Sequence, residues 1–223
     1  MASLGGRVGK FDVAAPCPCP GSVLDPSLKI MNLKVAIFRH AYVRDLEGLG
    51  EKIIYLSNDV EFSLGYFYVP GATFGTFIDN LDHFTDLKDF QPHYIIVVLE
   101  GNDLQANIDL SEIYKHCSEF YGLLRASFPD SVIIASQIEN RFYNINNRFC
   151  SPGARLFDYL RRNFNKHLKN KSFKDFLLQV QGPNHLDNRI NYRDAVHLSP
   201  VGLRKYFEII RRTLDYAYSK RPS

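Results

Sequence analysis

The chain has 223 residues, of which 45% are hydrophobic and 23% are charged, and it carries a net charge of +3. This length and composition are typical of a globular protein with one sizeable core, and so small a net charge does not by itself imply a polyanionic partner. The 4 cysteines form neither a disulfide framework nor a zinc-binding spacing. We therefore predict free thiols, no metal and no cofactor.

The first 30 residues differ from the rest of the chain. They are rich in Gly, Ala and Pro, and such a segment cannot bury enough apolar surface to offset its ordering entropy. It also lacks the apolar stretch of a secretory signal, and no run approaches the roughly 18 to 20 apolar residues of a membrane span. We predict a flexible tail over residues 1–30, one domain over residues 31–223, and an intracellular, cytoplasmic protein that has no membrane partner.

The patterned part of the chain begins with short strands. Leu33–Phe38 is an apolar run, interrupted only by Lys34, of the length expected of a buried strand, and Val43–Leu49 has the spacing of a short helix. Ile53–Leu56 and Val60–Val69 are extended patterns, and Pro70-Gly71 then opens a loop. The strongest strand signal comes next.

This signal is Tyr94–Leu99, whose apolar run without alternation indicates that both faces of the strand are covered, as in a parallel sheet. A helix, a strand, a helix, a strand and a last helix are expected after it. They lie at about Ser111–Ser127, Val132–Ile138, Leu156–Leu168, Phe176–Val180 and Ser199–Ala217. This alternation predicts an α/β fold, a three-layer α/β/α sandwich with a central parallel sheet.

Ligands of open parallel sheets bind outside the carboxyl ends of the strands, so the residues there are the candidates for chemistry. Three segments follow expected strands, and one precedes the last helix. They are residues 38–42 (Phe-Arg-His-Ala-Tyr), 69–73 (Val-Pro-Gly-Ala-Thr), 100–103 (Glu-Gly-Asn-Asp) and 194–199 (Asp-Ala-Val-His-Leu-Ser).

In order and spacing, these segments resemble the sequence blocks of the SGNH (GDSL-like) hydrolases over about residues 33–217. Gly101-Asn102-Asp103 is similar to the family's Gly-x-Asn-Asp block, and residues 194–199 are similar to its Asp-x-x-His block. Gly71 is similar to the middle glycine, in a pattern found in SGNH-like domains of invertebrate retroelement proteins. The resemblance implies the flavodoxin-like fold of these esterases.

By the resemblance, His197 is the general base and Asp194 orients it, while Gly71 N–H and the Asn102 side chain stabilise the oxyanion. The first block departs from the family, because Arg39-His40-Ala41 stands in place of Gly-His-Ser. Ala41 thus occupies the nucleophile position, and alanine cannot attack a carbonyl. No other hydroxyl residue is placed by its sequence position to replace the nucleophile; those considered are Ser57, Ser63, Thr73 and Ser199. The resemblance implies an esterase fold that binds a small ester or acetylated ligand and hydrolyses it weakly or not at all.

The same motifs also have structural interpretations. Gly101-Asn102-Asp103 is an acceptable turn after a strand, and Pro70-Gly71 is a plain turn in its own right. Asp194 and His197 could cap or salt-bridge near the following helix. Their joint occurrence in the family order favours the functional interpretation.

The uneven distribution of charge supports an alternative function. Residues 141–223 carry 17 Lys and Arg against 6 Asp and Glu, a net charge of +11, whereas residues 1–140 carry a net charge of −8. Arg141 and Arg148 stand among aromatic residues, as a surface that binds phosphates and stacks bases requires, and Arg161 and Arg162 extend the basic segment. The alternative is a non-catalytic scaffold that binds nucleic acid (RNA) or protein, although such charges are also typical of a solvated helix face.

Overall fold

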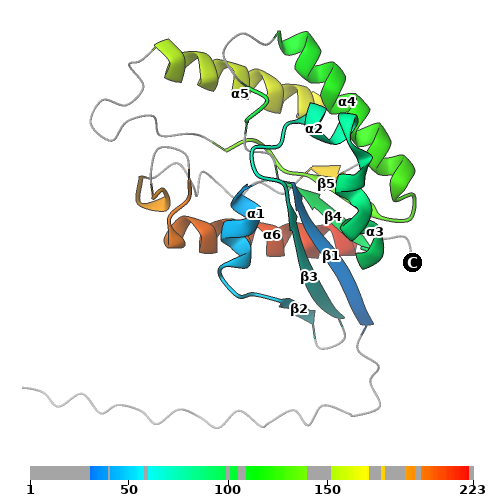
Figure 1. Ribbon diagram of the computed structural model, residues 1–223. Coiled ribbons are helices and arrows are strands. Elements are labelled where there is room, and N and C mark those ends of the chain that lie inside the picture. Colours follow the sequence, from blue (N-terminus) through cyan, green and yellow to red (C-terminus); the bar gives the residue numbers. More distant parts are fainter. Residues whose placement is uncertain are drawn as a thin grey trace, which may run out of the picture.

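The fold is built on a six-stranded sheet with the strand order β2-β3-β1-β4-β5-β6 (Figure 1). The computed structural model describes residues 31–39, 41–57, 60–98, 101–104, 109–139, 152–170, 177–178, 189–193 and 197–220. The strands are β1 (Met31–Arg39), β2 (Ile53–Ser57), β3 (Val60–Tyr68), β4 (Tyr94–Val97), β5 (Val132–Ala135) and β6 (Leu177–Leu178). The tail predicted over residues 1–30 lies outside the described residues.

All neighbouring strands pair in parallel except β2, which pairs antiparallel with β3 at one edge of the sheet. Without β2, the order is that of the doubly wound flavodoxin-like sheets, in which the direction of winding reverses beside the first strand. Here the reversal lies between β1 and β4. The predicted α/β fold with a central parallel sheet is confirmed, and β2 is an antiparallel addition to it.

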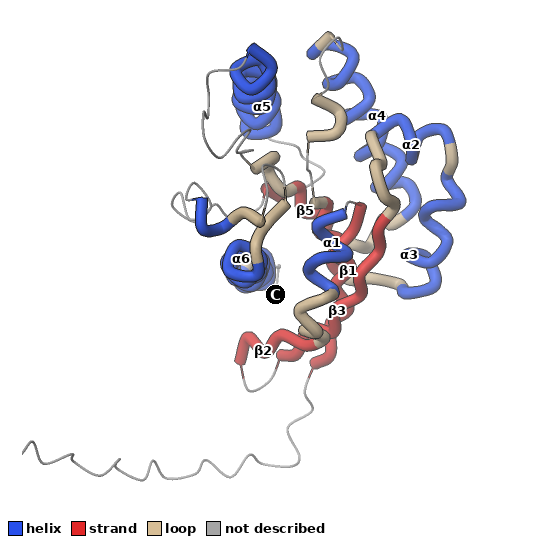
Figure 2. Tube along the Cα trace, turned by 60° about the vertical axis from the view of Figure 1, so that its left-hand side comes forward, coloured by secondary structure: helices blue, strands red, loops and turns tan. Residues whose placement is uncertain are grey.

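Helices cover both faces of the sheet (Figures 1 and 2). On one face lie α1 (Ala41–Glu47) and α6 (Pro200–Ser219). The other face is covered by α2 (Phe74–Asp79), the 3-10 helix η1 (Leu81–Phe84), α3 (Thr85–Phe90), α4 (Leu110–Ser127) and α5 (Pro152–Asn170). None of the described helices is long and apolar enough to cross a membrane.

The apolar strands supply side chains to both helical layers. In β1, Val35 and Ile37 are buried on the α1 and α6 face, whereas Ala36 and Phe38 are buried on the opposite face. Successive side chains of a strand point to opposite faces, so a strand covered on both sides must be apolar throughout. All four residues of β4 are buried, as the run without alternation predicts.

The segment after the Pro-Gly pair, predicted only as a loop, contains α2, η1 and α3. A capping box begins α2: the Thr76 N–H donates to Thr73 Oγ1 at 3.3 Å, and the Thr73 N–H donates to Thr76 Oγ1 at 3.0 Å. Phe74 and Phe77 anchor this helix by packing their rings on Phe120 of α4. A helix of six residues is too short to display a periodic pattern, although its two threonines are a readable start signal.

Candidate active site

The carboxyl ends of β3, β1 and β4 meet at one edge of the sheet, beside the point where the winding reverses. Arg39 pairs with Tyr68 at the last register position of β1 and β3, and the Val98 N–H donates to the Phe38 carbonyl at 3.0 Å. Predicted site residues follow all three strands: Ala41 after β1, Gly71 after β3 and Asn102 after β4. The topology therefore carries these three segments to the edge where ligands bind in folds of this kind.

The position of the missing nucleophile lies between β1 and α1, at the start of the helix. Ala41 is the first residue of α1, and β1 ends shortly before it, at Arg39. Val43 and Leu46 bury the inner face of α1 against the sheet and α6, which fixes the position of this helix. The side chains of Arg39 and Ala41, and the whole of His40, lie outside the described part of the chain.

Gly71 lies in a tight turn after β3. The Ala72 N–H donates to the Val69 carbonyl at 3.2 Å, so Pro70 and Gly71 occupy the two central positions of the turn. Gly71 has a φ of +70°, which glycine adopts readily at the second of these positions. The bond that closes the turn does not use the Gly71 N–H, and a Cβ at Gly71 would meet nothing within 4 Å. The Pro-Gly turn is thus observed, while the oxyanion role of Gly71 stays a prediction.

Gly101 is required where the chain turns out of the sheet after β4. Its φ is +81°, and a Cβ there would lie 3.0 Å from the ring of Phe157 and 3.1 Å from Ile138. Conformation and close packing therefore both favour glycine. Asn102, the next residue, is half-buried, which leaves part of its surface open to solvent at the candidate site.

Asp103 joins the segment after β4 to the segment after β3. Its side chain is buried, and its Oδ1 accepts a hydrogen bond of 2.6 Å from the N–H of Phe74, the first residue of α2. Helix α2 begins three residues beyond Gly71, and Asp103 directly follows Asn102. One buried carboxylate thus fixes the two segments that carry the predicted oxyanion donors, and this role of Asp103 was not predicted from the sequence.

His197 lies in a short hairpin that precedes α6. Tyr192 and Leu198 form an antiparallel bridge, and the Arg193 N–H donates to the His197 carbonyl at 2.8 Å. Ser199 closes the base of this hairpin, because its N–H donates to the Asn191 carbonyl at 2.8 Å. His197 is half-buried, and its predicted partner Asp194 lies outside the described residues. The pairing of these two side chains stays a prediction.

Close packing against α6 holds this hairpin in place. Asn191 is fully buried, and its carbonyl lies so near Gly202 that a Cβ on Gly202 would approach the oxygen to 1.9 Å. The Ser199 hydroxyl donates to the Ile190 carbonyl at 2.6 Å and accepts from the Gly202 N–H at 3.2 Å, capping α6. The position of His197 therefore depends on glycine at residue 202.

An ion pair connects the hairpin to α1. Arg193 lies 3.9 Å from Oδ2 of Asp45, whose side chain is only 12% exposed, and Asp45 is also paired with Arg44 at 3.5 Å. Partly exposed pairs of this length contribute little to stability. The contact nevertheless joins the helix that begins at Ala41 to the segment that carries His197.

Three of the four other hydroxyl groups that the sequence offers near the motifs have structural roles elsewhere. Ser199 caps α6, Thr73 belongs to the capping box of α2, and Ser63 donates to Asn32 Oδ1 at 2.9 Å in the amino-terminal half of β3. The Ser57 side chain lies outside the described part. The three described hydroxyls therefore do not follow the carboxyl end of β1.

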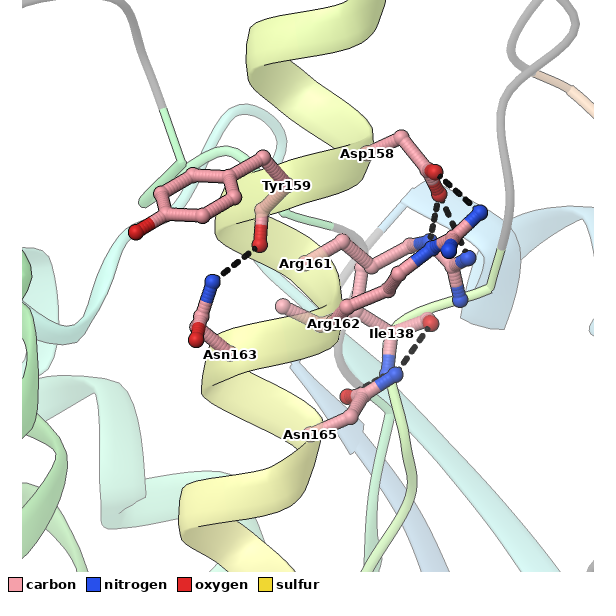
Figure 3. Close-up of polar contacts among 7 residues, drawn as sticks. All are labelled: Ile138, Asp158, Tyr159, Arg161, Arg162, Asn163 and Asn165. Carbon is pink, nitrogen blue, oxygen red and sulfur yellow. Dashed lines mark hydrogen bonds and ion pairs between the residues drawn. The ribbon is translucent and has the colours of Figure 1, made fainter.

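Two of the basic residues of α5, Arg161 and Arg162, pair with one carboxylate (Figure 3). Asp158 lies 2.6 Å from Arg161 and 2.7 Å from Arg162. Burial raises the pKa of the Asp158 carboxyl, but hydrogen bonds and ion pairs with both arginines outweigh burial and hold that pKa below its ordinary value. Arg141 and Arg148 lie outside the described residues, and no group of three His, Cys, Asp or Glu within the described ranges could hold a metal.

No protein-family model and no curated protein matches this sequence, but solved structures do. A GDSL-like lipase from Bacteroides thetaiotaomicron is 15% identical with a TM-score of 0.51, over 84% of this chain and 88% of that chain. A lipase/acylhydrolase from Enterococcus faecalis is 13% identical with a TM-score of 0.52, over 83% of this chain and 96% of that one. The chain has the fold of the GDSL-like hydrolases. At these identities the likeness is one of fold, and it confirms the SGNH-type architecture expected from the four motifs.

Replacing Asp103 should loosen the connection between the β3 and β4 segments. Asp103→Ala leaves the buried Phe74 N–H without this acceptor, so we expect a loss of about 1–3 kcal/mol in the free energy of unfolding. Asp103→Asn keeps an oxygen at the same place and should lose less. Urea unfolding of the unchanged protein and the two variants measures both losses of stability. An equal loss in the two variants would contradict a hydrogen-bonding role of Asp103.

Substitution of Gly202 should displace the hairpin that carries His197. Gly202→Ala places a methyl group against the Asn191 carbonyl, and overpacking of this kind costs about 1–3 kcal/mol. Gly122→Ala is the matched control, because a Cβ at this exposed position of α4 meets nothing within 4 Å. In the control, the free energy of unfolding should stay the same or rise by up to about 1 kcal/mol, since alanine is the better helix former. Thermal unfolding measures both effects. If the two variants change the melting temperature equally, a clash with the Asn191 carbonyl is not the cause.

Proposed function

We propose that this chain is an SGNH-type hydrolase domain that binds a small ester or acetylated ligand at the carboxyl edge of its sheet and hydrolyses it weakly or not at all. The proposal rests chiefly on one observation: Ala41, Gly71 and Asn102 follow three adjacent parallel strands, in the fold of the GDSL-like hydrolases. The Asp103 bond to Phe74 adds support, because it ties two of these segments together.

Acyl transfer in such a site needs four contributions. A nucleophile attacks the carbonyl, a base takes its proton, a carboxylate orients that base, and donors stabilise the oxyanion. In this proposal His197 is the base, Asp194 orients it, and the Gly71 N–H and Asn102 side chain are the donors. Ala41 supplies no nucleophile, and the loss of a triad nucleophile lowers turnover by on the order of a million-fold. Binding of an ester would survive this loss, because the donors do not depend on the hydroxyl.

The alternative, a scaffold that binds nucleic acid, depends on cations that are free to meet phosphates. Arg161 and Arg162 both bind Asp158, which reduces their net charge toward a partner. Nucleic-acid binding through the basic C-terminal half stays a prediction, with salt-dependent binding to a random oligonucleotide as its test. Asp158→Asn releases both arginines, so a nucleic-acid surface that includes them would bind more tightly in this variant.

Restoring the nucleophile tests the proposed function directly. Ala41→Ser supplies the hydroxyl, and Arg39→Gly removes a bulky side chain from the position where the family keeps glycine. We expect the double variant to hydrolyse a short-chain aryl ester faster than either single variant, by at least about tenfold over the starting protein, a small part of full triad catalysis. The measurement is initial rate at equal concentrations of folded protein.

Two controls decide what any recovered activity means. His197→Ala in the double variant should abolish the gain, because the base is then missing. A gain that survives this change would not be triad chemistry. If the double variant is folded, binds the ester and remains inert, the site binds but is not arranged for acyl transfer. If it neither binds nor turns over the ester, the proposed function is wrong.

A further inference from the structure

Strand β3 has a stretch of open edge directly before the Gly71 turn. Its partner β2 pairs only with the amino-terminal half of β3, from Val60 to Ser63, and the Leu64 N–H then donates to the Lys52 carbonyl at 2.8 Å. Beyond Leu64 the outer side of β3 has no paired strand among the described residues, although its inner side pairs with β1 as far as Tyr68 (Figure 1).

The backbone groups along this edge point outward at alternate residues. Because the Leu64 N–H points toward β2, the alternation of a strand directs the N–H and C=O groups of Tyr66 and Tyr68 to the same outer side. The edge therefore offers two donors and two acceptors in the pattern of a β-ladder. Unpaired groups of this kind are a template for another extended chain.

A cavity of about 370 Å³ lies at this edge. It is lined by Phe38, by the consecutive residues Tyr66, Phe67, Tyr68 and Val69, and by Asp82, His83 and Asp86 of η1 and α3. Side chains of an added strand would therefore meet aromatic rings along β3 and carboxylates from the neighbouring helical layer. The cavity has room for the long side chains of one or two residues.

Carboxylates flank the edge on both faces of the sheet. Asp82 and Asp86 are exposed on one side. On the other, the Tyr66 hydroxyl donates to the Glu51 carbonyl at 2.7 Å. Burial raises the pKa of Tyr66, and the nearby carboxylates of Glu51 and Glu47 raise it further. Among the described side chains, the basic groups at this edge are Lys52, directly before β2, and His83, so the described acidic side chains outnumber the basic ones there.

We propose that the open edge of β3 at Tyr66–Tyr68 binds an extended, basic segment of a partner protein as an added β-strand. Main-chain hydrogen bonds to Tyr66 and Tyr68 hold the segment, and its Lys or Arg side chains meet Asp82 and Asp86 and lie over the aromatic rings. The excess of carboxylates at this edge favours a basic partner. A second copy of this chain would bring the same carboxylates against one another, which disfavours self-pairing.

This inference does not depend on ester binding, and a peptide assay tests it separately. The probes are three fluorescent eight-residue peptides: alternating Val and Lys, alternating Val and Glu, and the Val-Lys peptide with an N-methyl group on every backbone amide, so that neither of its edges can donate hydrogen bonds. With the full chain at low salt, we expect only the first peptide to bind measurably, because the second is repelled and the third cannot complete the ladder. On binding, amide hydrogen exchange should slow at Tyr66 and Tyr68.

Two double variants separate this edge from general electrostatics. Asp82→Asn with Asp86→Asn should weaken binding by about five- to tenfold, whereas Asp79→Asn with Asp89→Asn should change it by less than about twofold. Both pairs remove two exposed negative charges from the same region, but Asp79 and Asp89 do not line the cavity. Three results would overturn the proposal. The two pairs of substitutions could weaken binding equally, or the N-methylated peptide could bind as well as the unmodified one. The third is a dimer of the chain in which the same amides are protected.

Discussion

The position of β1 between β3 and β4 is the constraint on which the rest of the structure depends. Its backbone is hydrogen-bonded on both sides, and Val35 to Phe38 are buried on both faces. A shift of register by one residue would exchange the side chains of the two helical layers, and both cores forbid this. The three strand ends are therefore fixed relative to one another, and the segments that follow them inherit their places from the sheet.

The supports of the candidate site also serve the fold, so their presence does not depend on catalysis. Asp103 satisfies the first N–H of α2, Gly101 permits close packing of Phe157, and Gly202 admits the Asn191 carbonyl. Removal of any of these would destabilise the protein whether or not it acts on a substrate. A Gly-Asn-Asp motif in this fold is consequently evidence for the architecture, whereas the hydroxyl that Ala41 lacks would have been evidence for the chemistry.

How far the sequence predicted this structure depended on the kind of signal. Tyr94–Val97 and Leu110–Ser127 were predicted well, because a strand buried on both faces and a long amphipathic helix have distinct apolar patterns. The antiparallel direction of β2 and the three short elements after Gly71 were missed, since strand direction has no local pattern and short helices are held by tertiary contacts such as Phe77 on Phe120. The motifs also predicted which segments lie after the strands, but not the bonds between segments, such as Asp103 to Phe74 and Arg193 to Asp45, which join residues far apart in the chain.

The open edge of β3 and the candidate site share Val69, the residue directly after the strand. Val69 lines the cavity beside Tyr66–Tyr68, and its carbonyl also accepts the hydrogen bond from Ala72 that closes the turn around Gly71. A strand added at the edge would restrict β3 up to the point where this turn begins. The Gly71 N–H, one of the predicted oxyanion donors, would then be held by a less mobile strand. Any such coupling must be reciprocal, so a ligand that orders the turn would favour binding at the edge to the same extent.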